Sequence, residues 1–253
     1  MAAELWLLPL SFLLVASVYS SVGFGGGSSY LAILALVALP FQEMRLTALI
    51  CNIIVVTGGT IIYARRQELP FRKLLPIVLA SVPLTFAGAR LRISEHTFYV
   101  YLGLSLILAG LLLLLRQTSG DATSTDSAVP NPIRDMVLGG AIGFLSGMVG
   151  IGGGIFLAPI LHLVKWDSSK KIAATAGFFI LVNSITGVIG QLSSVPEQLN
   201  ISRIAVLALA VLVGGQIGSR MGATRLNHTM VRRITAVLVL VAGIEVLWKH
   251  LSI

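Results

Sequence analysis

The sequence predicts an all-α polytopic membrane protein, and three observations predict it: the composition, the apolar runs and an internal repeat. Of its 253 residues, 56% are hydrophobic and only 11% are charged, and the mean hydropathy is +0.93. Soluble domains carry about 25% charged residues, so most of this chain must lie where charge is costly, in a lipid bilayer. This composition excludes a soluble enzyme, a secreted disulfide scaffold and a disordered regulator.

The apolar runs predict the membrane segments. They cover residues 5–39, 46–63, 74–89, 98–115, 133–164, 172–192, 201–217 and 230–248. A span needs about 20 apolar residues, so the first and fifth runs are too long for one helix each. Both contain a glycine cluster, VGFGGG at 22–27 and VGIGGG at 149–154. Because each glycine costs a helix about 1 kcal/mol relative to alanine, each long run is predicted to form two helices separated by its glycines.

The two halves of the chain resemble each other. Residues 22–34 align without a gap with 149–161, and Gly-x-Arg recurs at 88–90 and 218–220. Between the halves lies the polar stretch QTSGDATSTDSAVPN. Each half is therefore predicted to be a repeat made of a glycine-broken helical hairpin and three transmembrane helices, as in many transporters. The predicted boundaries are an N-terminal repeat at 1–116, a cytoplasmic linker at 117–132 and a C-terminal repeat at 133–253.

The basic residues favour one topology. If both glycine-broken runs are re-entrant hairpins, five of the 18 Lys and Arg fall on one side of the membrane and thirteen on the other. If each run instead crosses once, the division is eight to ten, which gives no orientation. Only the hairpin arrangement satisfies the positive-inside rule. It predicts inverted repeats, termini on the periplasmic side and a cytoplasmic linker.

The glycine clusters predict a site for a small anion. Glycine lets backbone N–H groups converge and lets a ligand approach closely, and the helix that follows presents free N–H groups and a positive dipole end. Ser28 and Ser29 add hydroxyl donors at the first helix start, and Asn52 and Asn183 are mid-span amides. The predicted binding residues are Gly23, Gly25, Gly26, Gly27, Ser28, Ser29, Asn52, Gly150, Gly152, Gly153, Gly154 and Asn183.

Alternative interpretations exist for these residues. Glycine clusters also serve close helix packing, and each asparagine could form a buried bond between helices. Thr47 and Thr175 are expected to hydrogen-bond to carbonyls of their own helices. The tryptophans near the run ends are expected to form an interfacial belt; they are Trp6, Trp166 and Trp248.

Enzymatic chemistry is not predicted. Ser28 and Ile155 stand where a dinucleotide fingerprint needs its third glycine, and neither cluster is followed by the Lys-Ser/Thr of a P-loop. The single cysteine, Cys51, cannot form an internal disulfide, and the four histidines show no ligand spacing. We expect no catalytic residue, no metal, no cofactor and no nucleic acid partner.

With its paired Gly-x-Gly-Gly-Gly clusters, duplicated four-helix unit, Pro159 and repeated Gly-x-Arg, the whole chain resembles the sulfite exporter TauE/SafE family, also called TSUP or DUF81. The resemblance implies a carrier of the bacterial inner membrane that exports sulfite or small organosulfonates such as sulfoacetate. The first repeat departs from the second by having Ala32 in place of Pro159, and serines in place of Ile155 and Phe156.

The residues leave other functions open. These are an anion channel, a transporter of other organic anions and, less favoured, a membrane scaffold without transport. The expected partners are a small anionic solute and membrane lipid, and a homodimer is left open.

Overall fold

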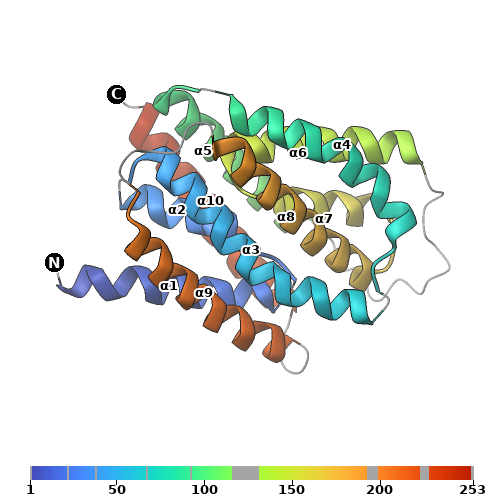
Figure 1. Ribbon diagram of the computed structural model, residues 1–253, viewed down its shortest axis with the longest axis horizontal. Helices are drawn as coiled ribbons and strands as arrows, with labels where there is room; N and C mark the ends of the chain where they lie inside the picture. The colour runs from blue at the N-terminus through green and yellow to red at the C-terminus, as the bar shows by residue number, and fades with distance from the viewer. Residues whose placement is uncertain are drawn as a thin grey trace.

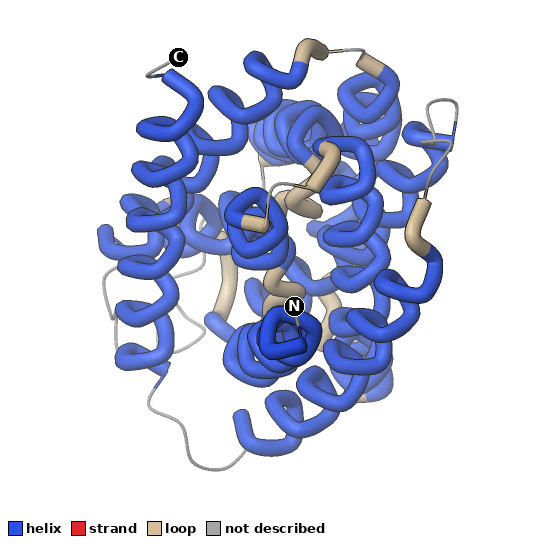
Figure 2. Tube along the Cα trace, turned by 90° about the vertical axis from the view of Figure 1, so that its left-hand side faces the viewer, coloured by secondary structure: helices blue, strands red, loops and turns tan. Residues whose placement is uncertain are grey.

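The computed structural model describes residues 2–21, 23–37, 39–66, 68–91, 93–115, 131–192, 199–222 and 228–251. The regular structure in these ranges is helical throughout (Figures 1 and 2). Nearly all of the predicted linker, 117–132, lies outside the described residues. The helices are α1 (Ala2–Ser20), α2 (Gly27–Leu36), α3 (Phe41–Arg65), α4 (Phe71–Arg90), α5 (Glu95–Leu115), α6 (Pro132–Val149), α7 (Gly154–Leu163), α8 (Ser169–Gln191), α9 (Ile201–Gly222) and α10 (His228–Leu251).

Both long apolar runs are broken at their glycines, as predicted. α1 ends before the first cluster and the ten-residue α2 begins at Gly27, while α6 ends before the second and the ten-residue α7 begins at Gly154. The breaks follow from backbone conformation, because Gly26 and Gly153 have φ angles of 89° and 82°. This left-handed region costs other residues about 1–2 kcal/mol.

Five helices in the described part of the chain are long and apolar enough to cross a membrane: α3, α4, α5, α8 and α9. α5 shows why the exterior must face lipid. Leu102, Leu106 and Ala109 are fully buried, whereas Leu104 and Leu108 are 53% and 48% exposed. A soluble helix would carry polar residues on its outer stripe, so a helix that is apolar on both faces indicates a lipid-facing surface.

Helix packing links the two halves of the chain. α4 packs against α6 and α9 against α1, while α3 and α8 contact each other at the centre and α5 contacts α10. Exchanging α1–α5 with α6–α10 leaves this set of pairs unchanged, which is the relation expected of two repeats about a two-fold axis.

Glycines allow the closest of these contacts. On α6, Gly139, Gly143 and Gly147 recur every fourth residue, and a Cβ on any of them would collide with the α4 backbone. On α9, Gly214 and Gly218 contact the α1 backbone in the same way. Small residues at this spacing let membrane helices approach closely.

The bundle has two distinct ends. α1 and α9 begin and α10 ends at the left of Figure 1, which we call the terminal end, and Figure 2 is viewed from this side. We call the opposite end the linker end. At the terminal end Arg203 of α9 donates to Glu43 of α3 over 3.1 Å. At the linker end Asp167 accepts from Lys73 of α4 over 2.7 Å.

Trp166 does not belong to an interfacial belt, and that prediction was wrong. Its side chain is 2% exposed, and its indole Nε1 donates to the buried Asp135 over 3.0 Å. Trp166 lies at the end of an apolar run, as a belt residue would, but the turn after α7 folds against the start of α6 and buries its side chain. Trp6 and Trp248, in contrast, are 79% and 78% exposed.

Candidate functional site

The two glycine loops end in helix N-termini without side-chain caps. Gly26 is the N-cap of α2 and Gly153 is the N-cap of α7, and neither provides a capping side chain. The first four N–H groups of a helix have no partner within it. Each N-terminus also carries roughly half a positive charge. Both loops therefore present donors and positive potential without a charged side chain.

Asn52 of α3 lies between the two loops. Its amide Nδ2 donates to the carbonyl of Ile151 in the second loop over 3.0 Å. A Cβ on Gly25 or Gly27 of the first loop, or on Gly152 of the second, would collide with the Asn52 amide. The absence of a side chain at all three positions lets backbone from both repeats meet around one amide.

A small cavity lies at this meeting point, with space for about one water molecule. Its lining includes five of the predicted residues: Gly25, Gly26, Gly27, Ser28 and Asn52. The aromatic and aliphatic remainder was not predicted from the sequence; it is Tyr19, Phe24, Ile151, Ile155 and Ile180. Phe24 and Ile151 could have been found, since they occupy the same position in the two glycine clusters.

Several buried polar atoms around the loops have no hydrogen-bond partner within the protein. They are the hydroxyls of Tyr30, Thr47, Ser146, Thr175 and Ser184 and the Oδ1 of Asn52. The expected bonds from Thr47 and Thr175 to their own helices are therefore not made. Buried polar groups normally find partners, so such a group of atoms is typical of a place where a polar ligand or water binds.

Two predicted residues have other partners. Asn183 lies on α8, where its Oδ1 accepts a hydrogen bond from Thr85 of α4 over 2.7 Å, and it is absent from the lining of the cavity. Ser29 shares a 2.7 Å hydrogen bond with the hydroxyl of Tyr19, in which either oxygen could be the donor. The Nδ2 of Asn183, the group that could donate to an anion, is buried without a hydrogen-bond partner. The assignment of both residues to the site stays a prediction.

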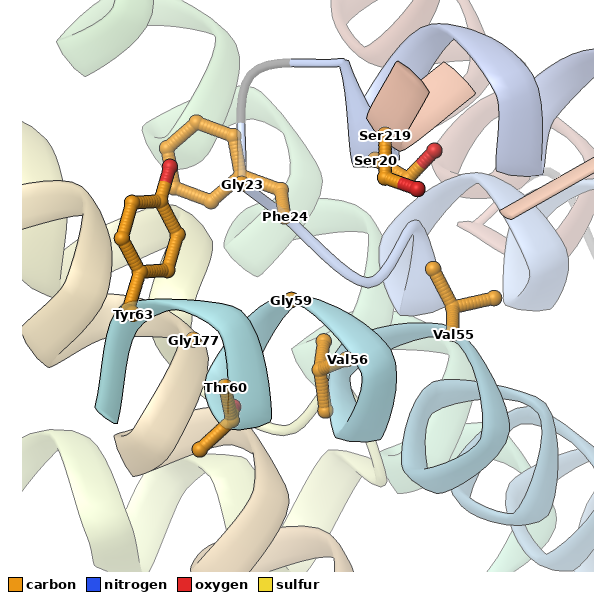
Figure 3. A pocket seen from close by; sticks show the side chains of 10 residues that line it. All are labelled: Ser20, Gly23, Phe24, Val55, Val56, Gly59, Thr60, Tyr63, Gly177 and Ser219. Atoms are coloured by element: carbon orange, nitrogen blue, oxygen red, sulfur yellow. The ribbon is translucent and has the colours of Figure 1, made fainter. Parts of the chain in front are cut away.

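A second small cavity lies towards the linker end, beside Gly23 (Figure 3). It is lined by Ser20, Gly23, Phe24, Val55, Val56, Gly59, Thr60, Tyr63, Gly177 and Ser219. Phe24 lines both cavities and is 9% exposed. Phe24 is thus the residue that the linings of the two cavities share.

The chemistry of these cavities is neutral. No Asp, Glu, Lys or Arg is among the described residues that line them. Within the same described ranges, no group of three or more His, Cys, Asp or Glu could hold a metal ion. What the two loops offer a ligand is backbone N–H groups, hydroxyls and one amide.

An apolar helical bundle in which two broken helices bring their glycine loops together is typical of membrane transporters. The chain belongs to the sulfite exporter TauE/SafE family, whose family model matches residues 8–246. It is a multi-pass membrane transporter and not an enzyme, and the expected family resemblance is confirmed.

Relatives agree with this class. The chain is 30% identical to the "Probable membrane transporter protein y4hK" of Sinorhizobium fredii, with 95% of this chain and 97% of that protein covered. It is 24% identical to the "Probable membrane transporter protein YunE" of Bacillus subtilis, with 94% and 95% covered. A shorter match, 32% identical over 94 residues, is to the "Probable membrane transporter protein MJ0441" of Methanocaldococcus jannaschii. No solved structure matches.

Proposed function

We propose that the protein exports a small oxyanion, sulfite or an organosulfonate such as sulfoacetate, across the bacterial inner membrane by alternating access. The anion binds between the two glycine loops, where the N-termini of α2 and α7 and the amide of Asn52 contact it. The chain consists of two inverted repeats, 1–116 and 133–253, joined by a cytoplasmic linker at 117–132.

The observation that carries this proposal is that the two glycine loops, which lead into the uncapped starts of α2 and α7, meet at Asn52. Two half-charges of positive sign suit an anion of one or two charges. A cation is disfavoured at such a place. Neutral donors also suit a transported ligand, because a fixed arginine at the binding position would hold an anion tightly and slow its release. The family description supports sulfite, and the pairing of helices across the halves supports the repeats.

Flux into proteoliposomes tests the proposal. We expect saturable uptake of sulfite and sulfoacetate, inhibition by other small oxyanions and no competition by sodium, potassium or choline. Counterflow of labelled against unlabelled sulfoacetate is expected for a carrier. Rapid flux without saturation or counterflow would instead indicate an anion channel, and stabilisation or transport of cations alone would refute an anion site.

The topology is tested by reporters. We expect a reporter that is active only in the periplasm to be active when fused after residue 253 and inactive when inserted near residue 124. The reason is that the helix ends at the linker end carry most of the described basic residues, and cytoplasmic segments are enriched in them. Opposite results at both positions would invert the orientation, and activity at both would exclude the hairpin arrangement.

A further inference from the structure

The two ends of the bundle differ at positions that the repeats make equivalent. The alignment of the glycine clusters pairs Gly23 with Gly150 and Ser20 with Gly147. The alignment of the Gly-x-Arg motifs pairs Ser219 with Ala89. Ser20, Gly23 and Ser219 line the cavity at the linker end. Their counterparts, which lie towards the terminal end, surround a side chain instead.

That side chain is Arg45. Its Nη2 donates to the carbonyl of Gly147 over 2.8 Å and to that of Ala89 over 3.4 Å. A Cβ on Gly150 would lie 3.1 Å from the Cβ of Arg45. The guanidinium therefore bridges α3 to the last turns of α6 and α4, and it occupies the place that corresponds to the cavity at the linker end.

The register of α3 and α8 explains the difference. Aligning Thr47 with Thr175 places Arg45 opposite Ala173. A Cβ on Gly23 would lie 3.4 Å from the Cβ of Ala173, just as a Cβ on Gly150 would lie close to the Cβ of Arg45. The short side chain of Ala173 leaves room for the cavity on the linker side, whereas the long side chain of Arg45 fills the corresponding place on the terminal side.

One helix turn further along, the same contrast recurs. Gly177 of α8 lines the cavity, and its counterpart on α3 is Leu49. Leu49 is 1% exposed and packs against Gly187, the counterpart of the cavity-lining Gly59. Arg45 and Leu49 therefore fill the space on the terminal side that corresponds to the cavity beside Ala173 and Gly177 on the linker side.

The positive charge of Arg45 is balanced by backbone carbonyl groups at helix C-termini and not by a carboxylate among the described residues. The residue is 4% exposed, and none of the described carboxylates forms an ion pair with it. Its acceptors belong to the C-terminal turns of α4 and α6, each of which carries roughly half a negative charge. Its Nε has no hydrogen-bond partner. The edge formed by Nε and Nη2 is the fork that binds planar or tetrahedral oxyanions.

We propose that Arg45 is the gate residue of the terminal side and selects anions there. With no anion present it seals the path by bonding to Gly147 and Ala89. A small oxyanion that reaches the guanidinium competes with these partial charges, takes the Nε–Nη2 edge and opens the path to the glycine loops. The structure is then a state in which Arg45 closes the terminal side and a cavity lies on the linker side. The selection of anions rests on the function proposed above, whereas the closing of the path does not.

Cysteine labelling tests the gate without relying on transport. In a Cys51→Ser background, a Ser184→Cys reporter lies on α8 beside Gly152, on the terminal side of the loops. We expect it to resist a membrane-impermeant methanethiosulfonate added from that side while Arg45 is present. Arg45→Ala should speed labelling at least tenfold, and Leu49→Gly, which keeps the arginine, should also speed it. Arg90→Ala removes an exposed arginine from the same end and should change nothing.

The response to anions is read with the same reporter. With Arg45 present, sulfoacetate should speed labelling relative to sodium chloride at equal ionic strength, and in Arg45→Ala it should have no further effect. The gate is refuted if Arg45→Ala and Leu49→Gly both leave labelling slow, even when the protein transports sulfoacetate. If labelling opens in these variants but sulfoacetate neither speeds it nor is transported, the gate stands and the proposed substrate fails. If sulfoacetate is transported without speeding labelling, selection of anions by Arg45 is refuted.

Discussion

Replacing Gly26 or Gly153 by alanine is expected to lower anion flux about a hundredfold, the loss that a misplacement of about 1 Å can cause in a precisely built site. Both glycines have positive φ angles, so any other residue strains the backbone. The added Cβ would also lie 2.9 Å from the Tyr30 ring at Gly26 and 2.8 Å from the Phe179 ring at Gly153. The loop must shift, and the N–H groups of the following helix shift with it. Flux at saturating and at low sulfoacetate measures the loss.

Gly58→Ala is the matched control. Gly58 lies within α3, and an added Cβ there would meet only the end of the Gln216 side chain, at 3.4 Å. This variant should keep its flux. The amount of each protein in the membrane and its thermal midpoint must be compared, because a strained loop also lowers stability. Normal flux in both loop variants would mean that the glycines serve only packing.

Replacing Asn52 by leucine is expected to weaken the apparent affinity for the transported anion at least tenfold. The variant loses the Nδ2 bond to Ile151, and it loses the amide around which both loops meet. A hydrogen bond to a charged acceptor is worth about 1.5–3 kcal/mol, and 1.4 kcal/mol corresponds to tenfold in affinity, so losing the amide as a donor to the anion accounts for the expected effect. The concentration dependence of flux and a thermal shift with added sulfoacetate provide two readouts.

Asn183→Leu makes the same chemical change elsewhere. Thr85 can still donate to the carbonyl of Gly143, 2.9 Å away, after its bond to Asn183 is lost. Affinity should therefore stay within about twofold, with the cost confined to stability. Equal losses of affinity in the two variants would remove the distinction that the structure makes between them.

The sequence predicted the broken helices because glycine acts locally. The starts of α2 and α7 lie within a residue of Ser28 and Ile155, since four glycines in six residues end a helix whatever surrounds them. The apolar exterior was predictable for a similar reason, because hydropathy summed along the chain does not depend on which helices touch.

The prediction paired Asn52 with Asn183 by residue type, whereas the packing follows the register of the two helices. Aligning Thr47 with Thr175 places Asn52 opposite Ile180, and the contacts agree: Gly27 lies against Asn52, and its counterpart Gly154 lies against Ile180. The two amides are therefore not equivalent, and only one meets the loops. Arg45 was missed on similar grounds. At the edge of an apolar run it is indistinguishable from a residue that faces water, and only the packing of α3 against the ends of α4 and α6 shows that it is buried.

The interlocked halves have a consequence for biosynthesis. The closest partner surface of α4 is the glycine face of α6, so the first half leaves the ribosome with a membrane helix whose partner has not yet been made. Lipid must occupy that face until the second half is inserted and displaces it. Neither half can complete its own packing alone. A chain truncated after α5 is therefore expected to be an assembly intermediate, and a gene split between α5 and α6 is expected to restore the protein only when both pieces reach the same membrane.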